Sequence, residues 1–428
     1  MNDSSQNTTI KKGSILIHQG RYKEAASIFQ DALSQDPEDD EILHLLAVCQ
    51  YHFPGQAATA LTTINQAIAL DPQGAYHHEL KGMILAEINK YPQAMEVIKE
   101  ALSLNPYSSH GQAVKAYIYI KLEKWREAEA AAREALALDA DNMFAGNILA
   151  TALNRQNRLD ESAHLVSDML RKDPEDCYSH SNAGWVYLNR KNYRQAQIHF
   201  REALRLDPNF EPARLGMLEV LKSKSLFYRL YLQYGLFMSR QTKQARWGII
   251  LGIYLVFRIV GKVAQNLFEG PLAFIAYASI ILLYGFFFWT WLSGGIGNFI
   301  IFNDPFARHA LNRNEKLDAI LVGGTFLAGI VVCGLAAILK MKAVLMLGGT
   351  MVLSTVPFAV TFTNAHKDGR LLYGSAGAFI LCSGVVSALF SHWRLPSHPE
   401  LANALLGSSL LLFIASTWLG AFGVLRKS

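Results

Sequence analysis

The phrase Ala203-Leu204-Arg205-Leu206-Asp207-Pro208 decides the fold of the first half of this chain, because five related phrases precede it. They end at positions 37, 72, 106, 140 and 174, so the six phrases follow one another at intervals of 35, 34, 34, 34 and 34 residues. All of them end in proline except the fourth, which ends in Ala140. A fixed period near 34 residues indicates a repeat array in which each unit packs on the next.

Each period has room for two amphipathic helices, and a single hairpin of this kind cannot bury its own apolar face. In the last unit the small residues Gly184 and Ala196 fall where paired helices must approach closely, and Phe200 supplies bulk between units. Six stacked hairpins over residues 9–208 would bury these faces. A further helix at residues 211–222 would cover the open end.

The period, together with Gly184, Tyr187, Ala196, Phe200 and Pro208, resembles the tetratricopeptide repeat over about half of the chain. The resemblance implies a solenoid whose concave groove binds another protein. It also implies that the groove is lined by the second, fifth, ninth, twelfth, thirteenth and sixteenth positions of the first helix of each hairpin. In the fourth, fifth and sixth hairpins those positions include ten expected groove residues: Lys121, Lys124, Asn147, Asn154, Arg155, Arg158, Tyr178, Trp185, Asn189 and Asn192.

This set of groove residues is basic and rich in asparagine. Arg and Lys with Asn can hold a carboxylate by charge-assisted hydrogen bonds, so an acidic peptide segment is the expected ligand. The set resembles the carboxylate clamp of chaperone-binding family members in residue type rather than in position. The alternative is that these long basic side chains at helix ends are simply solvated.

The second half of the chain has a different composition. Charged residues make up 18% of the chain and crowd into its first 246 positions, whereas the remainder holds several apolar runs of 18 or more residues. Such runs can cross a hydrocarbon core of about 30 Å. The sequence therefore predicts an all-α fold: a solenoid of about six hairpins, then a bundle of about six transmembrane helices, at 247–264, 271–292, 318–338, 343–362, 371–391 and 402–424.

The distribution of positive charge predicts how these spans are oriented. An even number of spans places both termini on one side, and residues 1–12 contain no apolar stretch like that of a secretion signal. Lys and Arg favour the cytosol for the solenoid, for two loops and for the tail, through Arg308, Arg313, Lys316, Lys367, Arg370, Arg426 and Lys427. We expect a multi-pass protein of the cytoplasmic (inner) membrane with cytosolic N- and C-termini.

Aromatic and basic residues alternate between the two halves. This composition is typical of a helix that lies among lipid headgroups, so we expect contact with the bilayer surface through Lys222, Lys224, Arg229, Arg240, Lys243 and Arg246. The alternative is a last solenoid helix whose aromatic residues belong to the core. The predicted domains are a cytosolic solenoid with its capping helix at 1–222, a juxtamembrane helix at 223–246 and a transmembrane domain at 247–428.

The whole chain also resembles a group of bacterial multi-pass membrane proteins with N-terminal tetratricopeptide repeats. Residues 228–230 (Tyr-Arg-Leu), 237–240 (Phe-Met-Ser-Arg) and 303–311 carry this likeness. It implies a bacterial cytoplasmic membrane location and no mechanism.

The usual signatures of catalysis and cofactor binding are missing from the sequence. There is no HExxH, Walker-type phosphate loop, GxGxxG or GxSxG motif, and the four cysteines form no CxxC pair. His77 and His78 are adjacent, so on a helix they point to different faces. We therefore expect no cofactor, no metal site and no enzyme activity. The net charge of +5 is concentrated beside the membrane, so lipid rather than nucleic acid is the expected anionic partner.

Two classes of function are consistent with these features. The first is a membrane-anchored scaffold that recruits a partner protein through the solenoid groove, in one version during assembly of a membrane complex. The second is a transporter, channel or membrane enzyme whose solenoid is regulatory, which would need a polar cavity within the helical bundle.

Overall fold

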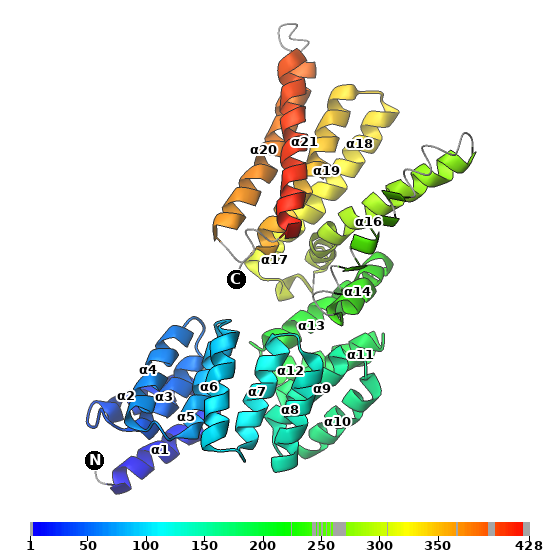
Figure 1. Cartoon of the computed structure of the whole chain (residues 1–428). Helices are drawn as coiled ribbons and strands as arrows, with labels where there is room; N and C mark the ends of the chain where they lie inside the picture. The colour runs from blue at the N-terminus through cyan, green and yellow to red at the C-terminus, as the bar shows by residue number, and fades with distance from the viewer. Residues whose placement is uncertain are drawn as a thin grey trace. The chain divides into compact units, whose positions relative to one another are not determined.

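The computed structural model describes residues 3–422 except 224, 242–244, 246–247, 250, 254, 257, 260–270, 306, 365–366 and 393–398. Within these residues the chain is built from helices and contains no strand (Figure 1). It divides into two compact units, Met1–Ala213 and Arg214–Ser428. The all-helical fold and the solenoid are confirmed.

The first unit is a solenoid of paired helices. Its helices are α1 (Asp3–His18), α2 (Tyr22–Leu33), α3 (Asp40–Tyr51), α4 (Ala57–Leu70), α5 (Ala75–Glu87), α6 (Tyr91–Leu104), α7 (Ser109–Lys121), α8 (Trp125–Leu138), α9 (Met143–Arg155), α10 (Leu159–Lys172), α11 (Cys177–Asn189) and α12 (Tyr193–Leu206). They form the six hairpins that the period predicts. The following helix, α13 (Glu211–Lys222), begins in the first unit and continues into the second.

The same local chemistry recurs in each hairpin. Each turn between paired helices contains one residue with a left-handed backbone, at Gly20, Gly55, Asn89, Glu123, Asn157 and Lys191. Four of the first helices start with a side chain that accepts a hydrogen bond from the first turn: Asp39, Ser108, Asn142 and Asp176. These caps satisfy amide groups that have no partner within the helix, and they fix where each helix begins.

Small residues and one large ring form the core of the last hairpin. Gly184 faces the fully buried ring of Phe200, and a Cβ atom added to that glycine would lie 2.5 Å from the ring. Ala196 and Ala203 are also fully buried. The predicted close approach at small residues is therefore confirmed, whereas the described contacts of the Phe200 ring, with Gly184 and Trp185, lie within its own hairpin.

The second unit contains the rest of α13, then α14 (Leu226–Ser239), α16 (Pro271–Phe302), the 3-10 helix η1 (Ala307–Ala310), α17 (Arg313–Asp318), the π-helix η2 (Ala319–Gly324), α18 (Thr325–Ile338), α19 (Lys342–Thr363), α20 (Lys367–His392) and α21 (Pro399–Phe422). Leu218 of α13 is buried with Ile301 and Leu311, and Arg214 donates two hydrogen bonds to the Glu315 carboxylate. Most of α13 therefore packs within the second unit.

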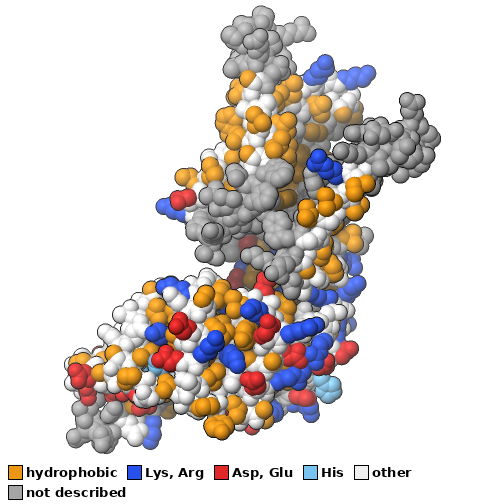
Figure 2. Space-filling model, in the orientation of Figure 1, with side chains coloured by type: hydrophobic (Ala, Val, Ile, Leu, Met, Phe, Trp, Pro, Cys, Tyr) orange, Lys and Arg blue, Asp and Glu red, His pale blue; other side chains and the backbone are white. Residues whose placement is uncertain are grey.

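Three of the predicted spans coincide with helices that are long and apolar enough to cross a membrane: Arg313–Ile338, Lys342–Thr363 and Lys367–Leu389. Within the described part of α21, the apolar stretch Ala404–Ser416 is shorter. The predicted span 271–292 lies in α16 and few of its side chains are described, and half of the residues of 247–264 lie outside the described residues. Figure 2 shows hydrophobic side chains over the helices of the second unit and a mixture of both charges over the solenoid.

Glycines allow the apolar helices of the second unit to pack closely. Gly329 of α18 and Gly348 of α19 face each other: a Cβ on Gly348 would lie 3.0 Å from the backbone oxygen of Gly329. Gly384 of α20 lies against the Thr350 side chain. Close approach at small residues is the usual way in which helices pack when the surroundings are apolar.

Candidate partner-binding groove

A cavity of about 710 Å³ is lined mainly by the first helices of successive hairpins, α3, α5, α7, α9 and α11. The walls of the cavity are formed by His44, Val48, Tyr51, His52, Tyr76, Glu79, Leu80, Met83, His110, Tyr117, Met143, Phe144, Asn147, Asp176 and Tyr178. Its volume is in the range of pockets that take small ligands or the side chains of a peptide.

Rings recur at one position of the helices that form this cavity. Tyr76, His110, Phe144 and Tyr178 each occupy the second residue of a first helix, so they follow one another at intervals of 34 residues. The ring centroid of Phe144 lies 6.0 Å from those of His110 and Tyr117. These rings give the cavity a largely apolar, aromatic surface.

The carboxylates of the cavity are already hydrogen-bonded. Glu79 is buried and accepts hydrogen bonds from Ser108 Oγ at 2.6 Å and from His110 Nδ1 at 2.8 Å. Asp176 caps α11 and accepts a hydrogen bond from Asn147 Nδ2 at 2.9 Å. Among the described residues that line the cavity there is no Lys or Arg. The cavity therefore suits an apolar side chain better than a carboxylate.

Lys121, a predicted groove cation, is paired within the solenoid. Its Nζ lies 3.0 Å from the Glu87 carboxylate and over the ring of Tyr117, whose hydroxyl donates to Glu87 at 2.9 Å. Burial alone would raise the pKa of Glu87, but the hydrogen bonds from Lys121 and Tyr117 outweigh it and the pKa is lowered. An incoming carboxylate would have to compete with Glu87 for Lys121.

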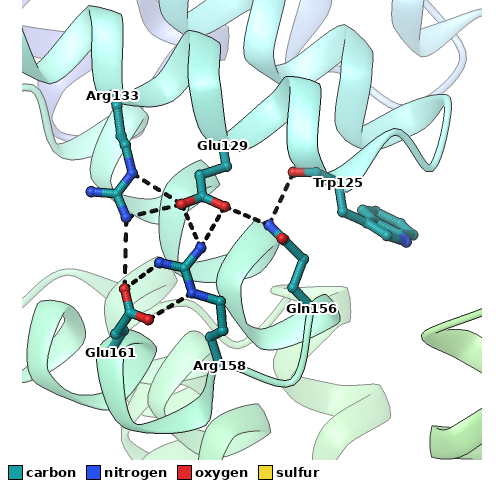
Figure 3. Close-up of polar contacts among 6 residues, drawn as sticks. All are labelled: Trp125, Glu129, Arg133, Gln156, Arg158 and Glu161. Atoms are coloured by element: carbon teal, nitrogen blue, oxygen red, sulfur yellow. Dashed lines mark hydrogen bonds and ion pairs between the residues drawn. The ribbon is translucent and has the colours of Figure 1, made fainter.

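Arg158 belongs to the charge network of Figure 3. Its Nη1 donates to Glu129 at 2.6 Å, and its other guanidinium nitrogens donate to Glu161. Arg133 and Gln156 also donate to Glu129, at 2.9 Å and 2.8 Å. Burial would raise the pKa of Glu129, yet the hydrogen bonds outweigh it and the pKa is lowered. Arg158 thus joins α8 to the following hairpin.

The other predicted groove residues have diverse surroundings. The exposed guanidinium of Arg155 lies 5.7 Å from the ring centroid of Trp125, and Lys124 is exposed just before α8. Asn189 donates to Asn154 at 2.9 Å, Asn192 caps α12, and Trp185 packs edge-on against Phe200. Of the ten predicted groove residues, Asn147 and Tyr178 line the cavity. Whether the ten residues bind a partner stays a prediction.

Three cavity residues, Tyr76, His110 and Phe144, were not predicted from the sequence. The signal was present, because these three and Tyr178 recur every 34 residues in register with the repeat. All three occupy the second position of a first helix, which is one of the groove positions that the family resemblance implies.

The juxtamembrane segment differs from its expected role at one residue. Lys222 is buried, and its Nζ lies 3.7 Å from Glu219 and 5.5 Å from the ring centroid of Tyr228. It therefore does not face a lipid surface, which corrects the expectation for this residue. Arg229 is exposed and Arg240 half-buried, while Lys224, Lys243 and Arg246 lie outside the described residues.

A second polar site lies in the second unit, where the sequence indicated little chemistry. Asp318 and Asn298 are both buried, and Asn298 Nδ2 donates to the Asp318 carboxylate at 2.8 Å. Asn298 Oδ1 has no hydrogen-bond partner among the described atoms. A buried carboxylate at the start of an apolar helix is a candidate functional group.

The fold defines a solenoid of helical hairpins, and family models match the same part of the chain. Models described as "Tetratricopeptide repeat" match residues 16–84, 78–108, 114–176 and 177–210. The N-terminal half of the chain therefore belongs to the tetratricopeptide repeat family. No curated protein matches the chain.

Several solved structures are similar to about half of this chain. TTC0263, a thermophilic tetratricopeptide repeat protein of Thermus thermophilus, is 25% identical over 45% of this chain and 98% of its own, with a TM-score of 0.39. A tetratricopeptide repeat protein of Parabacteroides merdae is 16% identical over 51% and 84%, with a TM-score of 0.43. The pilF protein of Pseudomonas aeruginosa is 18% identical over 52% and 99%, with a TM-score of 0.39.

Proposed function

We propose that this protein is a membrane-anchored scaffold whose solenoid binds an aromatic or aliphatic segment of a partner protein. The observation that carries this proposal is the cavity walled by Tyr76, Tyr117, Phe144 and Tyr178. Tetratricopeptide repeats bind proteins or peptides, and a concave surface with few charges and several rings is suited to holding an apolar side chain.

Binding energy at such a surface comes from the rings. Burial of apolar surface contributes about 25 cal/mol per Å², and a well-placed pair of aromatic rings adds about 0.5–1.5 kcal/mol. Tyr178 is 54% exposed, so it retains apolar surface that a partner could cover. A Tyr or Phe side chain has only two χ torsions, so little side-chain entropy is lost when a ligand fixes it.

The proposed anchor is the bundle of apolar helices in the second unit. Val331, Leu335 and Ile338 form an exposed apolar face on α18, and Leu371 and Leu389 are exposed on α20. Contiguous apolar surface of this kind is unfavourable in water and favourable in lipid. With the charge distribution of the loops, it supports a multi-pass protein of the cytoplasmic membrane whose two termini are cytosolic.

An acidic partner segment is the alternative ligand. It would use the predicted groove cations Lys121, Lys124, Arg155 and Arg158, of which Lys121 and Arg158 are paired with Glu87, Glu129 and Glu161. It would leave the aromatic cavity unused. The two ligands therefore predict different footprints on the solenoid.

A second candidate function is a transporter, channel or membrane enzyme with a regulatory solenoid. The specific observation that favours it is the buried pair of Asp318 and Asn298 at the start of an apolar helix. Under this alternative, Asp318→Asn would abolish activity in the membrane without changing what the solenoid binds.

Site-specific crosslinking of the full-length chain in native membranes tests the main proposal. A photo-crosslinking residue at position 178, inside the cavity, should capture one protein, whereas the same residue at position 107 should not. Tyr107 is a suitable control because it is 82% exposed and does not line the cavity. Equal capture at both positions would reject the groove as the binding site.

Two variants then separate the two ligands. Met143→Glu places a carboxylate in the cavity at the first residue of α9, where a negative charge is favourable for the helix and where α3 naturally carries Asp40. It should reduce capture at position 178 for an apolar segment. Reversing Lys124 and Arg155 to Glu should leave that capture unchanged, and loss of capture with this double variant would instead identify an acidic segment.

A further inference from the structure

Three potential metal ligands meet where the second and third hairpins pack together. Asp40 opens α3, Asp71 directly follows α4, and His77 lies in the first turn of α5. One ligand atom from each lies within 4.8 Å of the other two. His77 is fully buried, and both aspartates are half-buried, so solvent reaches the cluster from the carboxylate side.

The spacing of these atoms suits a metal ion. His77 Nε2 and Asp40 Oδ2 are 3.1 Å apart. Two ligands that each lie about 2.0–2.2 Å from a tetrahedral or octahedral ion are separated by roughly 3.0–3.6 Å. A modest movement of the Asp71 side chain would complete a set of one imidazole nitrogen and two carboxylate oxygens.

His44 can fix the tautomer of His77 that such a set requires. The Nδ1 atoms of His77 and His44 are 3.3 Å apart. If His77 Nε2 gives its lone pair to a metal ion, His77 Nδ1 carries the proton and donates a hydrogen bond to His44 Nδ1. A hydrogen bond from the second ring nitrogen to a neighbouring acceptor is the common arrangement of metal-binding histidines.

Comparison with the other repeats shows that this cluster is a local departure from the pattern. The residue equivalent to His77 is Gly111 in α7, Ala145 in α9 and Ser179 in α11. Gly74 stands where the neighbouring first helices have a capping side chain. A Cβ atom on Gly74 would lie 2.6 Å from Asp71 Oδ2 and 3.1 Å from His77 Nε2, so the glycine leaves open the space beside both ligands.

We propose that Asp40, Asp71 and His77 bind a divalent transition-metal ion, with His44 as the positioning residue for His77. Among the common ions, Zn²⁺ suits a set of one imidazole nitrogen and two carboxylate oxygens. Three protein ligands leave a further coordination position for water or a partner side chain. The sequence predicted no metal site, because two adjacent histidines point to different faces of a helix. His77 does not need His78 as a second ligand, since Asp40 at the start of α3 and Asp71 directly after α4 lie beside it.

The test uses the full-length chain in detergent, stripped of metal and titrated with Zn²⁺ by equilibrium dialysis. Asp71→Asn removes a carboxylate but keeps the turn, because Asn105 occupies the same position in the next repeat and accepts the same backbone hydrogen bond. His77→Ala copies Ala145 at the equivalent position. The matched control is Asp139→Asn, which changes the equivalent aspartate of a repeat without the histidine.

Wild type and Asp139→Asn are expected to bind one Zn²⁺ tightly, whereas Asp71→Asn and His77→Ala bind it at least about tenfold more weakly. His44→Asn should weaken binding less than the loss of a ligand. Co²⁺ in place of Zn²⁺ should give the visible absorption of a tetrahedral site in wild type and lose it in Asp71→Asn. Absence of tight binding in wild type, or equal affinity of wild type and Asp71→Asn, would overturn the proposal, and Asp71→Asn decides it even if His77→Ala fails to fold.

Discussion

The two units of the molecule are both helical, but equally exposed residues have different neighbours in each. Ile198 on α12 is 49% exposed and Ile330 on α18 is 48% exposed. Ile198 has Gln197 and Arg201 nearby in the sequence, whereas Ile330 has Val331 and Leu327, which are themselves exposed. Exposure alone therefore does not identify the solvent. The composition of the surrounding surface differs: it is polar around Ile198, and around Ile330 it is apolar, as expected of a helix long and apolar enough to cross a membrane.

A solenoid with a water-exposed surface needs a buried core of its own. Phe200→Ala should lower the free energy of unfolding of the solenoid by about 3–5 kcal/mol, because it removes a fully buried ring from a rigid hairpin. Pulse proteolysis of the full-length chain across a urea series would measure this change. Tyr107→Ala, at an exposed ring, should change it by less than about 0.5 kcal/mol. A loss below about 1 kcal/mol for Phe200→Ala would contradict the described packing.

Two matched variants, Ile330→Lys and Ile198→Lys, compare the surroundings of α18 and α12 directly. A lysine near the middle of a membrane span costs about 2.5–3.5 kcal/mol of apparent insertion free energy, whereas a lysine on a water-exposed helix costs little. Ile330→Lys should therefore reduce the fraction of the chain recovered in an alkali-washed membrane pellet, and Ile198→Lys should leave it unchanged. Equal recovery of the two variants would mean that α18 does not face lipid.

Acid should weaken the solenoid through its buried histidines. In the unfolded chain His44 binds a proton below about pH 6.5. In the folded chain burial, followed by His77 and His110, lowers the pKa of His44 to about 3. Between these values the unfolded state binds more protons, so the free energy of unfolding falls as the pH falls. The expected loss is about 2 kcal/mol between pH 6.5 and 5, at about 1.4 kcal/mol per unit.

A histidine pair provides the control for this acid sensitivity. His44→Asn, which copies Asn147 at the equivalent position, should make the urea midpoint less dependent on pH. His164→Asn should not, because the His164 side chain is 86% exposed. Similar pH profiles for wild type and His44→Asn would show that other groups dominate.

Much of the fold could be predicted because the repeat is written in local sequence. The phrases ending at Pro208 and its equivalents fix the hairpins, and the apolar runs fix the three long helices of the second unit. The site was harder because its contacts join different repeats. Arg158 and Glu129 lie 29 residues apart, and only the stacking of α8 on the next hairpin brings them together. Sequence register identifies which side chains share a surface, but not which of them neutralise each other.

The polar sites were missed for the same reason. The sequence places His77 beside His78, whereas its partners Asp40 and His44 lie on α3. In the sequence Asp318 only begins a predicted span, whereas Asn298 of α16 makes it part of a buried pair. In both cases the chemistry arises from helices that are far apart in the sequence.

The π-helical turn Ala319–Gly324 changes the phase of the helix that contains it. Such a turn holds one residue more than an α-helical turn, and one residue corresponds to a rotation of about 100°. The directions in which Asp318, before the turn, and Ile330, after it, leave the helix axis therefore differ from those in an uninterrupted α-helix. This angular offset lets one continuous helix direct a carboxylate toward Asn298 and, farther along, turn an apolar face outward.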